Sequence, residues 1–421
     1  MIKKFKEFYY SLKERIYLLA KKYSSKVGLD LPYFIKGGFW LGIGRIFLFI
    51  KGFLLSVILA NMLSKESFGE YNFVMTILIL AGIFALPGMG VAIVQAITKG
   101  YEGTYFKALR EVFKYSWIGS FALLGLSVYE YYRGNFNLSI IFLILSSLFP
   151  FYSISGYYSH FFNGEKRFDI LSKITSFFVV VSTILLIITL FITKSIFWIV
   201  LITVLSQIIV CGYFSIFYIK KFIDNKEVDS SSIKFGKNIS KSMVLTGIAS
   251  NFDSLIIVHF LNFSDLAVFR VIMTLPSQFE LLVNTFSPLI LPKMASSNLN
   301  KRDVLLHFKK FLFIILGIII LYIIIAPIVY FIFYPKYFEH TWLSILYSLT
   351  FINFLYLLPY NYLIKEKSRE LINKFNTFSA LLLIVLSFIG VFYYGLFGAV
   401  MARVIYSIVV ILFITILFLR A

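Results

Sequence analysis

The feature that most constrains this chain is a series of long apolar runs separated by short polar or turn-forming stretches. A helix needs about 20 apolar residues to cross the hydrocarbon core of a bilayer, and each of these runs is long enough. The sequence therefore predicts an all-α polytopic membrane protein with about twelve transmembrane helices. The predicted spans are 38–63, 70–97, 109–131, 138–161, 170–193, 196–219, 239–262, 267–292, 309–333, 341–363, 370–392 and 395–419.

The composition agrees with a membrane protein. Hydrophobic residues make up 60% of the 421 residues and charged residues only 14%, against about a quarter in an ordinary soluble domain. A water-soluble globular protein is therefore excluded, and the single cysteine, Cys211, cannot form a disulfide within the chain. The formal net charge is nevertheless +20, so the positions of the 40 Lys and Arg residues need an explanation.

The basic residues alternate loop by loop between the two sides of the predicted spans. If the N-terminus is cytoplasmic, 32 of the 40 Lys and Arg residues lie on the cytoplasmic side and four lie opposite. Those four are Lys65, Arg133, Lys194 and Lys336. Because Lys and Arg favour cytoplasmic loops, this asymmetry predicts that both termini are cytoplasmic. The positive net charge is then explained by the orientation of the chain in the membrane, and we expect no nucleic-acid partner.

The longest polar interruption divides the predicted spans into two sets of six. It covers 220–238 and predicts a cytoplasmic linker between an N-terminal lobe at 37–219 and a C-terminal lobe at 239–421. Leu63 to Thr76 align without gaps on Leu261 to Thr274, 198 positions later. An even number of spans in each half makes this repeat parallel, and two such lobes usually enclose a central cavity. Chance similarity between apolar helices is the alternative.

A basic stretch, 1–36, precedes the first span. It holds nine Lys or Arg residues against three acids, and its apolar residues recur at steps of three and four. This pattern predicts an amphipathic helix that lies on the anionic lipids of the inner leaflet. A solvated helix or a short coiled-coil seam is the alternative. We expect Gly37-Gly38 to end this helix before the membrane.

Features of an enzyme are missing from the sequence. There is no phosphate-binding glycine loop, no nucleophile constellation and no long external loop, and the four histidines have no metal-ligand spacing. We therefore expect neither catalysis nor a cofactor or metal. The energy for transport would come from an ion gradient, the membrane potential or the gradient of the substrate.

Two cations lie at membrane depth on the first predicted helix. Arg45 and Lys51 are six residues apart, so their side chains diverge by about 120° around the helix. An ionisable residue at this depth is costly and is expected to face a wet cavity, where both residues could bind the phosphate oxygens of a lipid-linked substrate. The alternative for Arg45 is that it reaches the cytoplasmic surface.

Asp253 and Glu280 are the only acids well inside the predicted spans. They could bind a coupling proton or Na⁺. They could instead pair with Arg45, Lys51 or Arg403, which would lower the cost of burying those charges. Structural pairing is the expected use of at least one of them.

Other polar residues of the second half have less specific interpretations. Arg403 could line the outward half of the cavity and bind substrate, or it could serve helix packing or snorkel. Arg270 lies near the outer surface and is expected to be an interfacial anchor. Asn251, Gln278 and Asn284 could donate hydrogen bonds to sugars or join helices to one another.

Three motifs of the first half are Phe68-Gly69-Glu70-Tyr71, Leu86-Pro87-Gly88-Met89-Gly90 and Lys99-Gly100-Tyr101-Glu102-Gly103. The second half contributes the helix of Asp253 and Gly395-Leu396-Phe397-Gly398-Ala399. Through these residues the sequence resembles bacterial polysaccharide transporters of the O-antigen flippase type, within the multidrug/oligosaccharidyl-lipid/polysaccharide (MOP) exporter superfamily.

The resemblance implies a flippase of the bacterial cytoplasmic membrane. Its substrate would be an undecaprenyl-diphosphate-linked oligosaccharide, moved to the outer leaflet by alternating access for O-antigen, capsule or exopolysaccharide synthesis. Arg45, Lys51 and Arg403 would be the cavity cations, and other polysaccharide-assembly membrane proteins would be partners. The alternatives are an ion-coupled multidrug or cation antiporter of the same superfamily and, from another class, a membrane glycan polymerase or glycosyltransferase.

Overall fold

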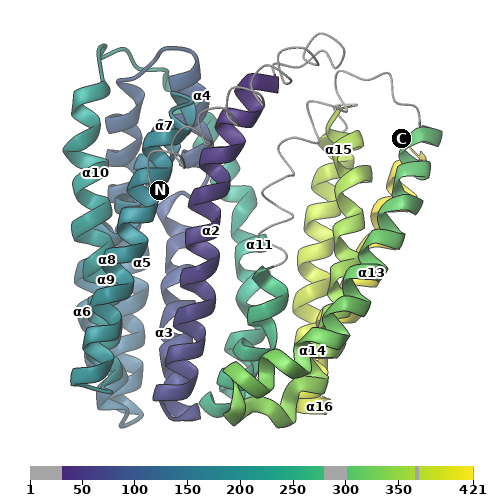
Figure 1. The fold of residues 1–421 in the computed structure, drawn as a ribbon. Coiled ribbons are helices and arrows are strands. Elements are labelled where there is room, and N and C mark those ends of the chain that lie inside the picture. The colour runs from purple at the N-terminus through teal and green to yellow at the C-terminus, as the bar shows by residue number, and fades with distance from the viewer. Residues whose placement is uncertain (1–30, 279–300, 366–368, 421) are drawn as a thin grey trace, which may run out of the picture.

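All regular structure in the described part of the protein is helical. The computed structural model describes residues 31–278, 301–365 and 369–420 (Figure 1). Its first half forms six successive helical stretches, several of them broken into shorter elements. In chain order these are α2 (Leu31–Met62), α3 (Lys65–Gly82), η1 (Ile83–Ala85), α4 (Met89–Thr98), α5 (Thr104–Tyr132), α6 (Phe136–Ser155), α7 (Tyr158–Gly164), α8 (Phe168–Ile192), α9 (Ile196–Ser206), η2 (Gln207–Cys211), α10 (Gly212–Ile216) and η3 (Tyr218–Phe222).

The second half repeats this number within the described residues. Its elements are α11 (Ser230–Phe260), a helix over 263–278, α13 (Lys301–Phe333), η4 (Pro335–His340), α14 (Thr341–Tyr347), η5 (Ser348–Tyr356), α15 (Leu357–Lys365) and α16 (Arg369–Arg420). Gly395 interrupts α16 with a φ of 56° and divides it into two helices, where the sequence predicts a boundary. Only a residue without a side chain adopts such a backbone conformation without strain.

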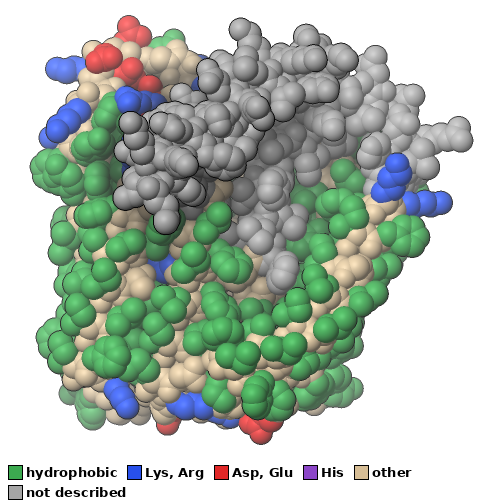
Figure 2. Space-filling model, in the orientation of Figure 1, with side chains coloured by type: hydrophobic (Ala, Val, Ile, Leu, Met, Phe, Trp, Pro, Cys, Tyr) green, Lys and Arg blue, Asp and Glu red, His purple; other side chains and the backbone are tan. Residues whose placement is uncertain are grey.

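The prediction of an all-α polytopic membrane protein is confirmed. Eight helices in the described ranges, with the divided α16 counted once, are long and apolar enough to cross a membrane, and two shorter apolar helices accompany them. Figure 2 shows apolar side chains over the flank of the molecule, whereas Lys, Arg, Asp and Glu gather at its two ends. This distribution fits a protein whose flank faces lipid.

The expected break at Gly37-Gly38 is wrong, because α2 runs through both glycines without interruption. Each glycine costs about 1 kcal/mol in a helix. Unpaired backbone groups cost several kcal/mol each where a helix enters a bilayer, so the continuous helix is favoured. Residues 1–30 of the expected amphipathic segment lie outside the described residues.

The motif at 86–90 forms a break between α3 and α4. Leu86 adopts a left-handed conformation with a φ of 55°, and the hydroxyl of Tyr157 donates a hydrogen bond of 3.3 Å to its carbonyl oxygen. Gly88 follows, where a Cβ atom would lie 2.6 Å from the carbonyl oxygen of Gly236. The break therefore permits α4 to cross α11 with backbones almost in contact.

Helix α11 begins nine residues earlier than the predicted seventh span, so the second part of the expected linker is helical. Asp229 explains this start, because its carboxylate accepts hydrogen bonds from the backbone N–H groups of Ser231 (2.9 Å) and Ser232 (3.2 Å). Such capping satisfies N–H groups that have no partner inside the helix. The first part of α11 packs on α4 and its second part on α16, so this helix joins the two lobes.

The internal repeat extends to the caps of two helices. The Ser64 hydroxyl accepts a hydrogen bond of 3.1 Å from the N–H of Ser67 at the start of α3. At the positions 198 residues later, the Asn262 side-chain oxygen accepts one of 2.8 Å from the N–H of Asp265. The same bond in both copies is expected of a true repeat rather than of chance similarity.

The two lobes share a hydrophobic core at one end of the molecule, which we call the Lys65 end. A mixed core at this end contains Leu59 and Leu63 of the first lobe together with Ile257 and Phe269 of the second. In Figure 1 this end lies at the bottom, and the helices of the two lobes diverge towards the opposite end, the Lys99 end. The chain thus has one closed end, whose contacts must change if the lobes move apart there.

Candidate functional site

The candidate site begins with Lys51, which lies on α2 between the two ends of the protein. Its Nζ donates a hydrogen bond of 2.7 Å to the hydroxyl of Ser182 on α8. It also lies 4.4 Å from the ring centroid of Phe178, a cation–π distance. Within the described residues Lys51 forms no ion pair with a carboxylate. It is therefore a half-buried cation with neutral partners.

The neighbours of Lys51 place it at the seam between the lobes. A Cβ atom on Gly52, the next residue, would lie 3.1 Å from the side-chain nitrogen of Gln278 in the second lobe. On the other side, α8 packs against η2, a short π-helical element. π-Helical elements are rare in proteins, and those that occur often lie at functional sites.

Two other predicted site residues cannot be placed in the same detail. Arg45 lies on α2, less than two turns before Lys51, and its side chain is outside the described residues. Glu280 lies outside them entirely. Their assigned roles stay predictions.

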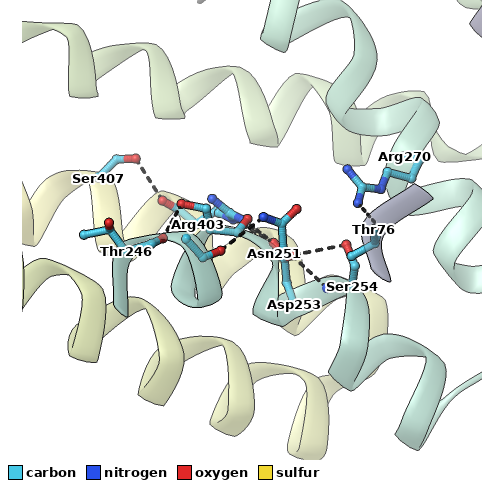
Figure 3. Close-up of polar contacts among 10 residues, drawn as sticks. Thr76, Thr246, Asn251, Asp253, Ser254, Arg270, Arg403 and Ser407 are labelled. Atoms are coloured by element: carbon cyan, nitrogen blue, oxygen red, sulfur yellow. Dashed lines mark hydrogen bonds and ion pairs between the residues drawn. The ribbon is translucent and has the colours of Figure 1, made fainter. Parts of the chain in front are cut away.

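The second part of the candidate site is a buried ion pair between α11 and α16 (Figure 3). Arg403 contacts the Oδ2 atom of Asp253 through Nε at 2.8 Å and through Nη2 at 2.5 Å. The other carboxylate oxygen accepts a hydrogen bond of 2.7 Å from the N–H of Ser254, and Arg403 also donates to the carbonyl oxygen of Ser250 at 2.7 Å. The Asp253 side chain is only 2% exposed. Of the uses predicted for Asp253, the structure shows pairing with Arg403.

Arg270 is not the interfacial anchor that we expected. Its Nη2 crosses to the first lobe and donates a hydrogen bond of 2.6 Å to the hydroxyl of Thr76, which is buried in α3 (Figure 3). Its Nε is buried without a hydrogen-bond partner among the described residues. The prediction used only the distance of Arg270 from the end of its helix, and the contact depends on which helix face meets the other lobe.

Each copy of the repeat places a threonine at this seam. Thr76 and Thr274 occupy equivalent positions, 198 residues apart, and each hydroxyl donates to the carbonyl oxygen four residues earlier. Each also contacts the other lobe: Thr76 accepts the bond from Arg270, and Thr274 lies 3.3 Å from the hydroxyl of Ser56. Equivalent threonines of the two copies therefore each contact the other lobe, Thr76 through Arg270 and Thr274 through Ser56 of α2.

A cavity of about 290 Å³ lies beside Arg403 inside the second lobe. Its wall is rich in tyrosine and asparagine, and the side-chain oxygen of Asn353 is buried there without a partner among the described residues. Sequence reasoning missed this cavity, although amides in apolar spans are a signal that could have indicated it. Polar and aromatic residues of the wall include Tyr347, Asn353, Tyr356, Tyr360, Asn376 and Tyr406.

The motif at 99–103 has a structural use in this protein. The Glu102 carboxylate accepts hydrogen bonds from the backbone N–H groups of Asp224 and, at 3.1 Å, of Asn225. The side-chain nitrogen of Asn225 donates in turn to the carbonyl oxygen of Gly100 at 2.7 Å. The motif thus fastens the linker to the first lobe and lies at the Lys99 end, away from Lys51.

The described residues thus form two helical lobes of a polytopic membrane protein, with charged residues buried at and near their seam. Residues 34–298 match the family described as "Polysaccharide biosynthesis protein", and the chain belongs to this family. No curated protein matches the sequence.

Several solved structures share the fold. The lipid II flippase MurJ in an inward closed conformation has a TM-score of 0.62 at 18% identity, covering 91% of this chain and 87% of MurJ. An outward-facing multidrug resistance MATE family transporter of the MOP superfamily has a TM-score of 0.59 at 14% identity, covering 92% and 96%. A MOP superfamily transporter from Pyrococcus furiosus has a TM-score of 0.54 at 14% identity, covering 92% and 95%.

Proposed function

We propose that this protein flips an undecaprenyl-diphosphate-linked oligosaccharide across the bacterial cytoplasmic membrane for O-antigen, capsule or exopolysaccharide synthesis. The observation that carries the proposal is Lys51, a cation at membrane depth with neutral partners, in a chain of the polysaccharide biosynthesis family. A cation in this position is costly unless its function is to meet an anion. The diphosphate of a lipid-linked glycan is such an anion.

Lys51 would bind the diphosphate as a point charge. The acceptor of its present hydrogen bond, the Ser182 hydroxyl, is neutral, and a charged phosphate oxygen in its place would form a stronger bond. Arg45, on the same helix, would supply a second contact. Arg403 and the tyrosine- and asparagine-rich cavity beside it would receive part of the glycan, because amide and hydroxyl groups suit the hydrogen bonds of sugars.

The arrangement of the lobes supports loading from the inner leaflet. The loops of the Lys99 end are rich in Lys and Arg, so we infer that this end is cytoplasmic together with both termini. The lobes meet at the Lys65 end and diverge towards the Lys99 end. Alternating access would then require the contacts at the Lys65 end to separate.

The charges also favour this function over the export of organic cations. A cavity for cations would need an acid that is free to bind them. Of the two acids predicted inside the spans, Asp253 is the one that the structure describes, and it is held by Arg403 and Ser254. In this conformation both oxygens of Asp253 already accept hydrogen bonds from other groups of the protein. Coupling through Asp253 would require this pair to open during transport.

The proposal can be tested by measuring the binding of undecaprenyl diphosphate to the purified protein in detergent. The variant Lys51→Met keeps the length of the side chain and removes its charge. Loss of one charged hydrogen bond, about 1.5–3 kcal/mol, should weaken binding about ten- to 150-fold. Lys194→Met, in the short turn between α8 and α9, is the matched control and should bind normally. Equal affinity of the wild-type protein and Lys51→Met would refute the role of Lys51.

A further inference from the structure

A second, larger cavity lies at the Lys65 end, between the two lobes. Its volume is about 970 Å³. The first lobe contributes α3, α5 and the turn before α6, and the second contributes α11, the start of the 263–278 helix and Phe388 of α16. The substrate site proposed above does not include these residues.

The walls of this interlobe groove divide into an apolar and a polar part. The apolar part consists of side chains from both lobes, including Phe73, Ile77, Leu126, Phe252, Leu255 and Phe388. The polar part lies at the helix ends and includes Glu66, Glu130, Arg133, Asn135, His259 and Asn262. In a bilayer the first set lies at the depth of acyl chains and the second near the head groups.

The apolar part of the groove is expected to be occupied by hydrocarbon and not by water. Water in an apolar cavity lacks hydrogen-bond partners, and apolar surface is stabilised by contact with other apolar groups. Phe388 is 46% exposed and Phe260, also in the wall, is 39% exposed. A membrane offers acyl chains to such surfaces at this depth.

The polar part carries both signs of charge. Arg133 is the exposed residue that caps the end of α5, and the central carbon of its guanidinium lies 5.6 Å from the ring centroid of Tyr129. Within the described residues Arg133 forms no ion pair. Glu66, in the first turn of α3, is likewise exposed and forms none. Glu130 is buried and accepts a hydrogen bond of 2.6 Å from Asn135. A head group with one phosphate and one ammonium matches this set.

We propose that the interlobe groove binds one phospholipid with a zwitterionic, phosphatidylethanolamine-type head group. The phosphate meets Arg133, the ammonium meets Glu66 and Glu130, and an acyl chain lies against Phe73, Leu126 and the second lobe. Because both lobes form the groove, the lipid stabilises the conformation in which they touch at this end. This proposal does not depend on the nature of the transported substrate.

Native mass spectrometry of the purified full-length protein tests this site. We expect one added phosphatidylethanolamine to be retained per chain, in preference to phosphatidylglycerol and undecaprenyl phosphate. Arg133→Ala should weaken retention about tenfold or more, because a charge-assisted contact is lost. Leu126→Trp, which narrows the groove with a larger apolar side chain, should have a similar effect. Lys194→Ala, at the same end but outside the groove, is the control and should behave as the wild type.

Three results would overturn the proposal. Equal retention of phosphatidylethanolamine and phosphatidylglycerol would show that Glu66 and Glu130 do not bind an ammonium group. Preference for undecaprenyl phosphate would identify the groove as part of the substrate path. Unchanged retention in both Arg133→Ala and Leu126→Trp would place the bound lipid elsewhere. Thermal stabilisation of the wild type by phosphatidylethanolamine, absent in Arg133→Ala, gives an independent readout of the expected result.

Discussion

The ion pair of Asp253 and Arg403 yields the sharpest prediction about stability. Replacing Asp253 with Asn leaves the Arg403 guanidinium next to a neutral group, in a place where the Asp253 side chain is only 2% exposed and that of Arg403 15% exposed. Removing one partner of a buried pair costs about 3–5 kcal/mol, because the remaining charge is buried without compensation. We therefore expect Asp253→Asn to lower the free energy of unfolding by this amount.

The assay is reversible unfolding in detergent micelles, followed for Asp253→Asn, for the single variants Asp253→Leu and Arg403→Met, and for the combination of these last two. Asp253→Leu together with Arg403→Met removes both charges and should recover most of the stability, since an apolar pair is often as stable as a buried ion pair. The matched control is Glu370→Gln, which breaks an exposed pair with Lys374 on the same helix. This control should change stability by less than about 0.5 kcal/mol.

A different pattern would refute the structural role of the pair. If Asp253→Asn is as stable as the wild type, the carboxylate does not compensate Arg403. If the apolar double variant is no more stable than the single variants, the two charges are not coupled to each other. In either case Asp253 would again be a candidate for binding a coupling ion.

Three further predictions concern the seam and the linker. Thr76→Val removes the acceptor of a buried arginine of the other lobe and should cost about 1.5–3 kcal/mol of unfolding free energy, measured in the same assay. Gly69→Ala should lower the free energy of unfolding by about 1–3 kcal/mol, because its methyl group would overlap the backbone of the second lobe. Gly125→Ala, in open space on a helix, should instead raise it by up to about 1 kcal/mol. Similar values for the two variants would contradict the close contact between Gly69 and the second lobe. Glu102→Ala should release the linker and speed its cleavage in limited proteolysis, while Glu227→Ala, at an exposed position within the linker, should not. Equal cleavage rates in the two variants would show that Glu102 does not hold the linker.

Much of the fold could be predicted because lipid imposes simple rules. The number of apolar runs, the division between α8 and α9 and the boundary at Gly395 follow from length, polarity and turn residues. The repeat could be aligned because equivalent loops carry equivalent caps, as at Ser64 and Asn262. These features are local, so a single sequence contains the information.

The features that could not be predicted depend on contacts between distant residues or on the membrane itself. The direction of the Arg270 side chain depends on its contact with Thr76 in the other lobe, which its position along the helix does not indicate. The pairing of Asp253 could be narrowed to a few cations, and the choice of Arg403 depends on the packing of α11 against α16. The helix through Gly37-Gly38 reflects the cost of unpaired backbone in a membrane, which outweighs glycine's low helix propensity.

The most direct test of the proposed function is transport by the purified protein in proteoliposomes. A labelled undecaprenyl-diphosphate-linked oligosaccharide is placed in both leaflets, and its exposure to an impermeant glycosidase is followed with time. We predict that wild-type protein speeds the exchange between leaflets and that Lys51→Met slows it at least about tenfold, while Lys194→Met does not. Exchange no faster than in protein-free liposomes, or transport of an organic cation instead, would contradict it.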